Sequence, residues 1–229
     1  MGIGFAASYG FKEILFNILV RPLVTVMEQG DHLIFTGLPE AFFTYLKVSL
    51  LSGLMVASPV ILYQFWMFVA PGLYRKERRL LAPIVILSSF FFVAGALFGY
   101  FIVFPWGFKF FLGFATESIR PLPSMKEYLA FSAKLLLAFG LVFELPMVLT
   151  FLARLGIVSV DFLKRNRKYA VLIFFAGAAI LTPPDVVTQV MMALPLMVMY
   201  ELSIIGARIL GKKKPAPEAE EDKAEQGAS

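Results

Sequence analysis

The stretch LLAPIVILSSFFFVAGALFGYFIVFPW, residues 80–106, contains no charged side chain. Folded as one helix it would be about 40 Å long, more than the roughly 30 Å of the hydrocarbon core of a bilayer. An uninterrupted apolar run of this length is typical of a transmembrane helix. The stretch therefore predicts that lipid is the solvent for at least this part of the chain.

Other long apolar segments lie before and after this stretch. Long apolar segments occupy residues 45–68 and 128–155, and two more, 169–181 and 186–209, are separated by a short turn at residues 182–185. The thirteen residues of segment 169–181 correspond to about 20 Å of helix, which is short for a bilayer. We expect these last two segments to form a tight helical hairpin that thins the membrane locally or extends into its flanking residues.

Composition supports a membrane protein and excludes several kinds of site. Of 229 residues, 59% are hydrophobic and only 16% are charged, too apolar a balance for one water-soluble core. There is no Cys and the only His is His32, so disulfides, thiolate metal sites and histidine clusters are excluded. No nucleotide-binding G-x-x-x-x-G-K-[ST] string, activated nucleophile or acid–base pair is apparent. The sequence thus predicts no cofactor, no metal and no enzymatic activity.

Basic residues gather at three places along the chain. Two apolar segments separate each cluster from the next, so all three lie on one face of the membrane, which the positive-inside rule makes cytoplasmic. This pattern favours membrane orientation over nucleic-acid binding as the reason for the net charge of +5. The C-terminus is then cytoplasmic, and loops 108–127 and 182–185 lie outside. The clusters are Arg75, Lys76, Arg78 and Arg79; Lys164, Arg165, Arg167 and Lys168; and Arg208, Lys212, Lys213 and Lys214.

The two ends of the chain complete the predicted topology. Residues 1–20 are apolar but interrupted by Lys12 and Glu13, as if the outer part of a first span continued into an amphipathic stretch. We interpret the chain as beginning inside this first span. The predicted fold is all-α and polytopic, a six-helix membrane domain at residues 1–211 with a truncated first helix. Residues 212–229, rich in carboxylates, are expected to be a disordered cytoplasmic tail.

Glu144 is the most informative polar residue of the apolar segments. It lies ten residues from Lys134 on one side and ten from Arg154 on the other, which places it near the membrane midplane. A carboxylate there costs roughly 2.5–3.5 kcal/mol, so it should face protein, water or a partner. Pro146 removes a helical hydrogen bond and predicts a kink beside it. A functional role is favoured, and a protonated Glu bonded to a neighbouring helix is the alternative.

Three other features have a structural interpretation on spacing alone. Gln189 and Glu201 are the polar side chains of the last segment, and hydrogen bonding between helices is the more common role for each. The G-x-x-x-G pattern from Gly95 to Gly99 favours close packing of helices. Glu77, alone among the basic residues of the first cluster, suggests either a local ion pair or a carboxylate that accepts an incoming guanidinium.

Residues 57–77, ASPVILYQFWMFVAPGLYRKE, resemble the second span and first cytoplasmic loop of the TatC family. The family pattern F-x-x-P-x-L-Y-x-x-E is matched at every specified position, by Phe68, Pro71, Leu73, Tyr74 and Glu77. Further matches follow in order: GYFIVFPWGFKF at 99–110, AFGLVFELP at 138–146 and LTPPDVVTQVMMALPLMVMYE at 181–201. The resemblance extends from Tyr9 to about Gly211.

This resemblance implies a membrane receptor for twin-arginine signal peptides in the bacterial cytoplasmic (inner) membrane. Such a receptor assembles with itself and with the single-span proteins TatB and TatA, and exports folded proteins using the proton motive force. It also implies roles for individual residues. These are signal-peptide binding for Phe68 and Glu77, a concave intramembrane face for Glu144, partner-helix docking for Thr182 and Gln189, and outer-loop functions for Pro22, Phe42 and Asp185.

One departure and two alternatives accompany the resemblance. The family normally begins with a cytoplasmic segment that helps to form the twin-arginine site, and nothing here matches it. A late start codon, a fragment and a different mode of signal binding would each explain this. The alternative functions are a proton-coupled small-solute transporter with Glu144 as its relay, disfavoured because the two halves show no repeat, and a scaffold that differs from the receptor only in lacking a ligand.

Overall fold

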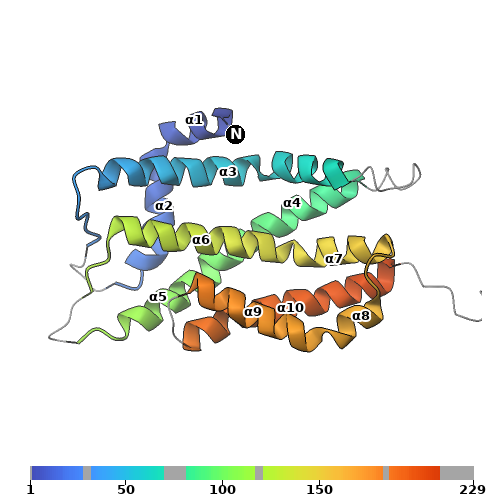
Figure 1. Cartoon of the computed structure of the whole chain (residues 1–229). Helices are drawn as coiled ribbons and strands as arrows, with labels where there is room; N and C mark the ends of the chain where they lie inside the picture. Colours follow the sequence, from blue (N-terminus) through green and yellow to red (C-terminus); the bar gives the residue numbers. More distant parts are fainter. Residues whose placement is uncertain (1, 28–31, 70–80, 117–120, 183–185, 212–229) are drawn as a thin grey trace, which may run out of the picture.

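The computed structural model describes residues 2–27, 32–69, 81–116, 121–182 and 186–211, and these are helical except for short connections. Successive helices run back and forth along a common direction (Figure 1). The protein is thus an all-α polytopic bundle, as predicted. Its elements are α1 (Gly2–Gly10), α2 (Lys12–Val24), α3 (Glu40–Val69), α4 (Leu81–Phe98), a π-helical turn (Gly99–Val103), α5 (Phe104–Leu112), α6 (Met125–Phe143), α7 (Leu145–Arg154), α8 (Val160–Arg165), α9 (Arg167–Leu181) and α10 (Val186–Leu210).

Four helical stretches in the described residues are long and apolar enough to cross a membrane. They are Glu40–Val69, Ala82–Leu112, Met125–Arg154 and Val186–Leu210. The second joins α4 to α5 through the π-helical turn, and the third joins α6 to α7 through Glu144. Helix α9 has only 15 residues, about 22 Å, so the short segment noted in the sequence extends by two residues at its basic end.

The first apolar segment forms two helices instead of one. Helix α1 lies beside α3, and α2 leads away from it (Figure 1). The α1–α3 contact is close because a glycine of each helix, Gly4 and Gly53, lies where they meet. A Cβ added to Gly53 would lie 2.9 Å from the Phe5 nitrogen. The chain turns at Phe11, just before the charged pair Lys12 and Glu13.

The centre of the bundle is the packing of α4 on α6. Phe139 of α6 is completely buried in the main apolar cluster. A Cβ added to Gly95 would collide with the Phe139 carbonyl oxygen and lie 2.8 Å from the Cβ of Phe143. The G-x-x-x-G pattern therefore serves close helix packing, which confirms its structural interpretation.

The short helix α9 and the long helix α10 lie side by side (Figure 1). At one end Arg167 of α9 donates a 2.8 Å ion-pair hydrogen bond to Glu201 of α10. Both side chains are half exposed, so the pair contributes at most about 1 kcal/mol. The Tyr200 hydroxyl donates to the Leu163 carbonyl oxygen at 2.9 Å and ties α10 to α8. The expected tail, residues 212–229, lies outside the described residues.

Candidate functional site

The end of α3 presents one aromatic ring and buries its near neighbour. Phe68 is 85% exposed, whereas Trp66, two residues earlier, is 1% exposed. The Trp66 indole N–H donates to Ser88 Oγ of α4 at 2.8 Å, and its ring packs edge-on against Phe151 of α7 with centroids 4.8 Å apart. Trp66 therefore fixes the end of α3 against two other helices and leaves the Phe68 ring available for contact.

Glu144 occupies a break in the third long helix. Helix α6 ends at Phe143 and α7 begins at Leu145, so the interruption falls where Pro146 was expected to disturb the helix. The side chain is 6% exposed, and neither carboxyl oxygen makes a hydrogen bond of good geometry to a described residue. A buried carboxyl group without partners is costly, which agrees with a site that accepts something from outside the chain.

Ser88 connects these two features, and sequence reasoning missed it. Its hydroxyl accepts from Trp66 and lies close enough to Glu144 to affect that carboxyl group. The sequence signal was the Ser88-Ser89 pair within an otherwise apolar span. The structure thus brings together Trp66, Ser88 and Glu144 from three helices, although they are far apart in the sequence.

The α9–α10 hairpin uses its polar side chains internally. Thr182 is buried and its hydroxyl donates to the Ala178 carbonyl oxygen at 2.9 Å. The Gln189 amide of α10 donates to the Phe175 carbonyl oxygen of α9 at 3.0 Å. The second of these hydrogen bonds confirms that Gln189 joins the two helices.

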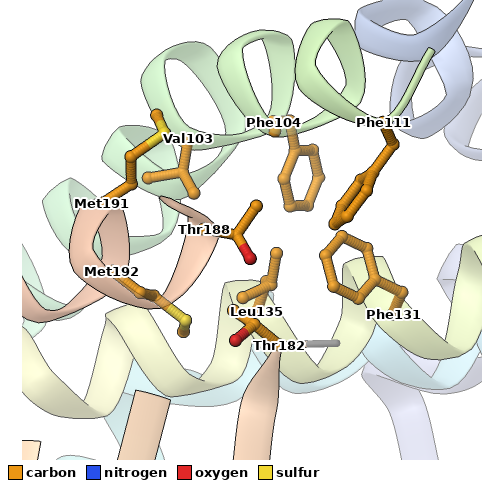
Figure 2. A pocket seen from close by; sticks show the side chains of 10 residues that line it. Val103, Phe104, Phe111, Phe131, Leu135, Thr182, Thr188, Met191 and Met192 are labelled. Carbon is orange, nitrogen blue, oxygen red and sulfur yellow. The ribbon is translucent and has the colours of Figure 1, made fainter. Parts of the chain in front are cut away.

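A small cavity lies where the hairpin meets α5 and α6. Figure 2 shows Thr182 and Thr188 facing it from the hairpin, with Phe104 and Phe111 from α5 and Leu135 from α6. Its volume is about 20 Å³, enough for roughly one water molecule. The cavity is therefore a packing feature beside the polar hairpin and too small for a ligand.

Pro22 has a specific effect on helix α2. A proline at this position has no N–H to donate to the carbonyl of Ile18, four residues earlier. The Tyr100 hydroxyl donates to that oxygen at 2.5 Å, and the Tyr128 hydroxyl donates to the next carbonyl, Leu19, at 2.6 Å. Two tyrosines from other helices therefore hold α2 across the bundle. The sequence contained the proline, but the tyrosines lie too far along the chain to be paired with it by pattern.

Replacing Tyr100 with Phe should lower the free energy of unfolding by about 1 kcal/mol, because the Ile18 carbonyl loses its donor. Tyr63→Phe is the control, since the Tyr63 hydroxyl has no hydrogen bond to a described residue, and it should change stability by less than about 0.5 kcal/mol. In a Pro22→Ala background residue 22 regains an N–H, so the Tyr100→Phe cost should shrink. Chemical unfolding of the purified protein measures all three; equal costs with and without Pro22 would contradict this assignment.

Glu40, at the start of α3, joins the loop before α3 to the segment before α6. Its Oε2 accepts from the Thr36 nitrogen at 2.7 Å, the Thr36 hydroxyl at 2.9 Å and the Gly37 nitrogen at 3.2 Å. Its Oε1 accepts from the Ser124 hydroxyl at 2.8 Å and the Lys126 nitrogen at 3.0 Å. Ile34 also pairs with Ser124 in a single parallel bridge. Sequence reasoning missed Glu40, because two of its partners, Ser124 and Lys126, lie more than 80 residues away.

The residues expected to carry function are distributed over separate regions. Phe42 and Phe68 lie near opposite ends of α3, about 39 Å apart along the helix. Phe42 is 55% exposed and stacks edge-on against Phe43, and Pro22 is buried in α2. Glu77 and Asp185 lie outside the described residues. Within the described ranges no group of three His, Cys, Asp or Glu side chains could hold a metal ion.

Comparisons with known proteins agree with this architecture. The family described as "Sec-independent protein translocase protein (TatC)" matches residues 1–195. A TatC protein of Desulforapulum autotrophicum is 67% identical over 220 residues, covering 96% of this chain and 82% of the relative. The TatC protein of Escherichia coli K12 is 36% identical over 198 residues, covering 86% and 77%.

The fold is also that of a solved relative. The crystal structure of a twin-arginine translocase receptor, TatC, superposes with a TM-score of 0.81 at 41% identity and covers 91% of each chain. Identity at this level over nearly the whole chain reflects common descent as well as a common fold. The chain therefore belongs to the TatC family of Sec-independent protein translocase proteins.

Proposed function

We propose that this protein is the receptor of a twin-arginine translocation system, which binds twin-arginine signal peptides and delivers folded proteins for export. Membership of the TatC family carries the proposal. The protein would act by binding and assembly, without a cofactor and without making or breaking covalent bonds. The proton motive force would supply the energy.

The signal-peptide site would combine Phe68 and Glu77. Phe68 has the geometry of a contact residue, because the buried Trp66 fixes the backbone next to it while its own ring stays exposed. A carboxylate such as Glu77 can accept a guanidinium through two parallel hydrogen bonds, which an ammonium cannot match. The two residues together would recognise an arginine pair next to an apolar segment.

Glu144 would lie along the path of the apolar part of the signal peptide. Its carboxyl group lies near Ser88, the residue that accepts from Trp66 at the Phe68 end of α3, so the two parts of the proposed site are linked by neighbouring side chains. Its unpartnered oxygens favour contact with a polar group of the peptide or of a partner helix over a purely internal role.

Partner helices of TatB and TatA would dock at the α9–α10 hairpin around Thr182 and Gln189. The Gln189 amide holds α9 through the Phe175 carbonyl oxygen, while its own amide oxygen can accept a bond from a partner. Because α9 is short, the bundle is thin at this hairpin. A single-span protein would lie beside this thin region. Several copies of the chain would then form one receptor complex.

The membrane would be the bacterial cytoplasmic membrane, with the basic clusters and the C-terminus on the cytoplasmic side. Phe68 and Glu77 then face the cytoplasm, where signal peptides arrive. Pro22, Phe42 and Asp185 belong to the outer side, where α2 and the loop tied by Glu40 would keep the outer end of the bundle in shape.

Replacing Phe68 with Ala should weaken signal-peptide binding about tenfold, the contribution expected from burying a phenyl ring in the complex. Phe90→Ala is the matched control, because Phe90 is also exposed on a helix of the bundle but lies on α4. Fluorescence anisotropy of a labelled twin-arginine peptide measures both. Equal losses in the two variants, or no loss in Phe68→Ala, would contradict the proposed contact.

A further inference from the structure

A groove of about 340 Å³ opens between the first turns of α3 and α6, at the far end of α3 from Phe68. Figure 1 shows both helices starting at this end of the bundle. We call it the Lys47–Lys126 groove, after the lysine that each helix contributes. It is lined by Thr36, Gly37, Pro39, Glu40, Phe43, Thr44, Lys47, Lys126 and Leu129.

Lys47 and Lys126 give the groove a net positive charge. Neither Lys47 nor Lys126 forms an ion pair within the described residues. The carboxylate of Glu40 also lines the groove, but it is occupied by its five hydrogen bonds from Thr36, Gly37, Ser124 and the Lys126 backbone. Two lysines and one glutamate leave a single positive charge, which matches one singly charged anion.

Thr44 adds a hydrogen-bond donor to the lining of the groove. It is only 2% exposed and lines the groove, yet its hydroxyl has no hydrogen-bond partner among the described residues. The hydroxyl reaches the groove, where it can donate to a bound group. A phosphate bound in the groove could accept hydrogen bonds from this hydroxyl and from the lysine ammonium groups.

The depth of the groove limits what that anion can be. Helix α3 has 30 residues and is about 45 Å long, against about 30 Å for the hydrocarbon core, so both of its ends reach the headgroup region. Lys47 lies about 10 Å along α3 from Glu40, at the border between headgroups and acyl chains. Phe43 is 53% exposed beside it and offers an apolar surface to an acyl chain.

We propose that the Lys47–Lys126 groove binds the phosphodiester of an anionic glycerophospholipid such as phosphatidylglycerol. The phosphate lies between the two ammonium groups and accepts from the Thr44 hydroxyl, and an acyl chain lies against Phe43. A phosphodiester carries one negative charge, equal to the net charge of the groove, whereas the choline cation of phosphatidylcholine would be repelled by the lysines. This lipid would connect α3 to α6 at the end where Glu40 already joins their loops.

The test is native mass spectrometry of the purified full-length chain titrated with dioleoyl phosphatidylglycerol, with dioleoyl phosphatidylcholine in parallel. Wild type should bind one phosphatidylglycerol more tightly than the rest and more tightly than phosphatidylcholine. Lys47→Gln and Lys126→Gln should each weaken that binding about fivefold, and the double variant about 25-fold. Lys109→Gln is the matched control, since Lys109 is exposed on α5 outside the groove, and it should change binding less than twofold.

Thr44→Val separates a lipid role from a structural one. It keeps the shape of the side chain and removes only the hydroxyl, so it should weaken phosphatidylglycerol binding about tenfold while the lipid-free melting temperature stays unchanged. A lowered melting temperature without lipid would show that the hydroxyl serves the protein and would overturn its assignment to the ligand.

Three further outcomes would overturn the proposal. Equal binding of the two lipids would exclude selectivity for the anion. Equal losses of phosphatidylglycerol binding in Lys47→Gln and Lys109→Gln would show that the lysines act only through the general charge of the surface. Complete displacement of the lipid by millimolar glycerol phosphate would mean that the groove takes a free phosphate and that the acyl chain contributes nothing.

Discussion

Glu77→Gln is expected to weaken binding of a twin-arginine signal peptide by about 30-fold or more. Truncating or neutralising one partner of a desolvated charge pair typically costs 2–5 kcal/mol, and a bidentate pair with arginine is among the strongest of these. Gln keeps the size of the side chain but can accept through only one oxygen. Isothermal titration of the detergent-purified protein with the peptide measures the change.

Two carboxylates serve as references for that experiment. Glu127→Gln removes an exposed negative charge at the other end of the bundle and should leave binding within about twofold. Glu144→Gln should weaken binding less than Glu77→Gln, because Glu144 is proposed to lie along the apolar part of the signal peptide and not beside its arginines. If Glu77→Gln and Glu144→Gln both retain full binding, the proposed recognition site is wrong.

Gly95→Ala is expected to destabilise the bundle by about 1–3 kcal/mol, a drop of roughly 5 °C in melting temperature. The added methyl group would collide with the Phe139 backbone oxygen, and a backbone atom inside a packed helix cannot move aside as a flexible side chain can. The helices α4 and α6 would have to separate at the most buried contact of the core. Thermal unfolding in detergent, followed by circular dichroism, measures the shift.

Gly177→Ala is the matched control for this substitution. Gly177 is also in a helix, α9, but an added Cβ would have nothing within 4 Å. The same chemical change there should raise stability by up to about 1 kcal/mol, because alanine favours a helix over glycine. Melting temperatures that fall equally in both variants would show that the loss at Gly95 comes from helix propensity and not from packing.

Hydrophobic runs predicted most of the fold because each transmembrane segment is encoded locally. The apolar run through residues 80–106 and the break near Pro146 depend on neighbouring residues, and both are present in the structure. The short α9 was also visible as a short run. The separation of α1 from α2 was harder to predict, since it depends on the close approach of Gly53 to the Phe5 backbone.

The contacts that support the site are long-range and were not predictable from spacing. Trp66 reaches Ser88 across 22 positions, and Glu40 reaches Ser124 across 84. Each of these residues has an ordinary local context, a tryptophan in an apolar segment or a glutamate at a helix start. Only the folded chain shows that Trp66 leaves Phe68 exposed and that Glu40 joins two loops.

The resemblance to the TatC family predicted roles for residues whose spacing alone did not indicate them. On spacing alone a local ion pair was the favoured interpretation of Glu77, and only the match to the TatC pattern favoured recognition of arginine. The roles of Glu77 and Asp185 stay predictions, because both residues lie outside the described part of the structure. The small-solute transporter has no support from the family comparisons, which point to protein translocation.

The most direct test of the receptor assignment is photocrosslinking between a probe at position 68 and a signal peptide, in membranes that contain this chain. We expect crosslinking to a twin-arginine peptide. An excess of the unlabelled twin-arginine peptide should abolish it, and an excess of the twin-lysine version should not. If the twin-lysine peptide competes equally well, the chain has the TatC fold without selectivity for arginine, and the proposed receptor function is wrong.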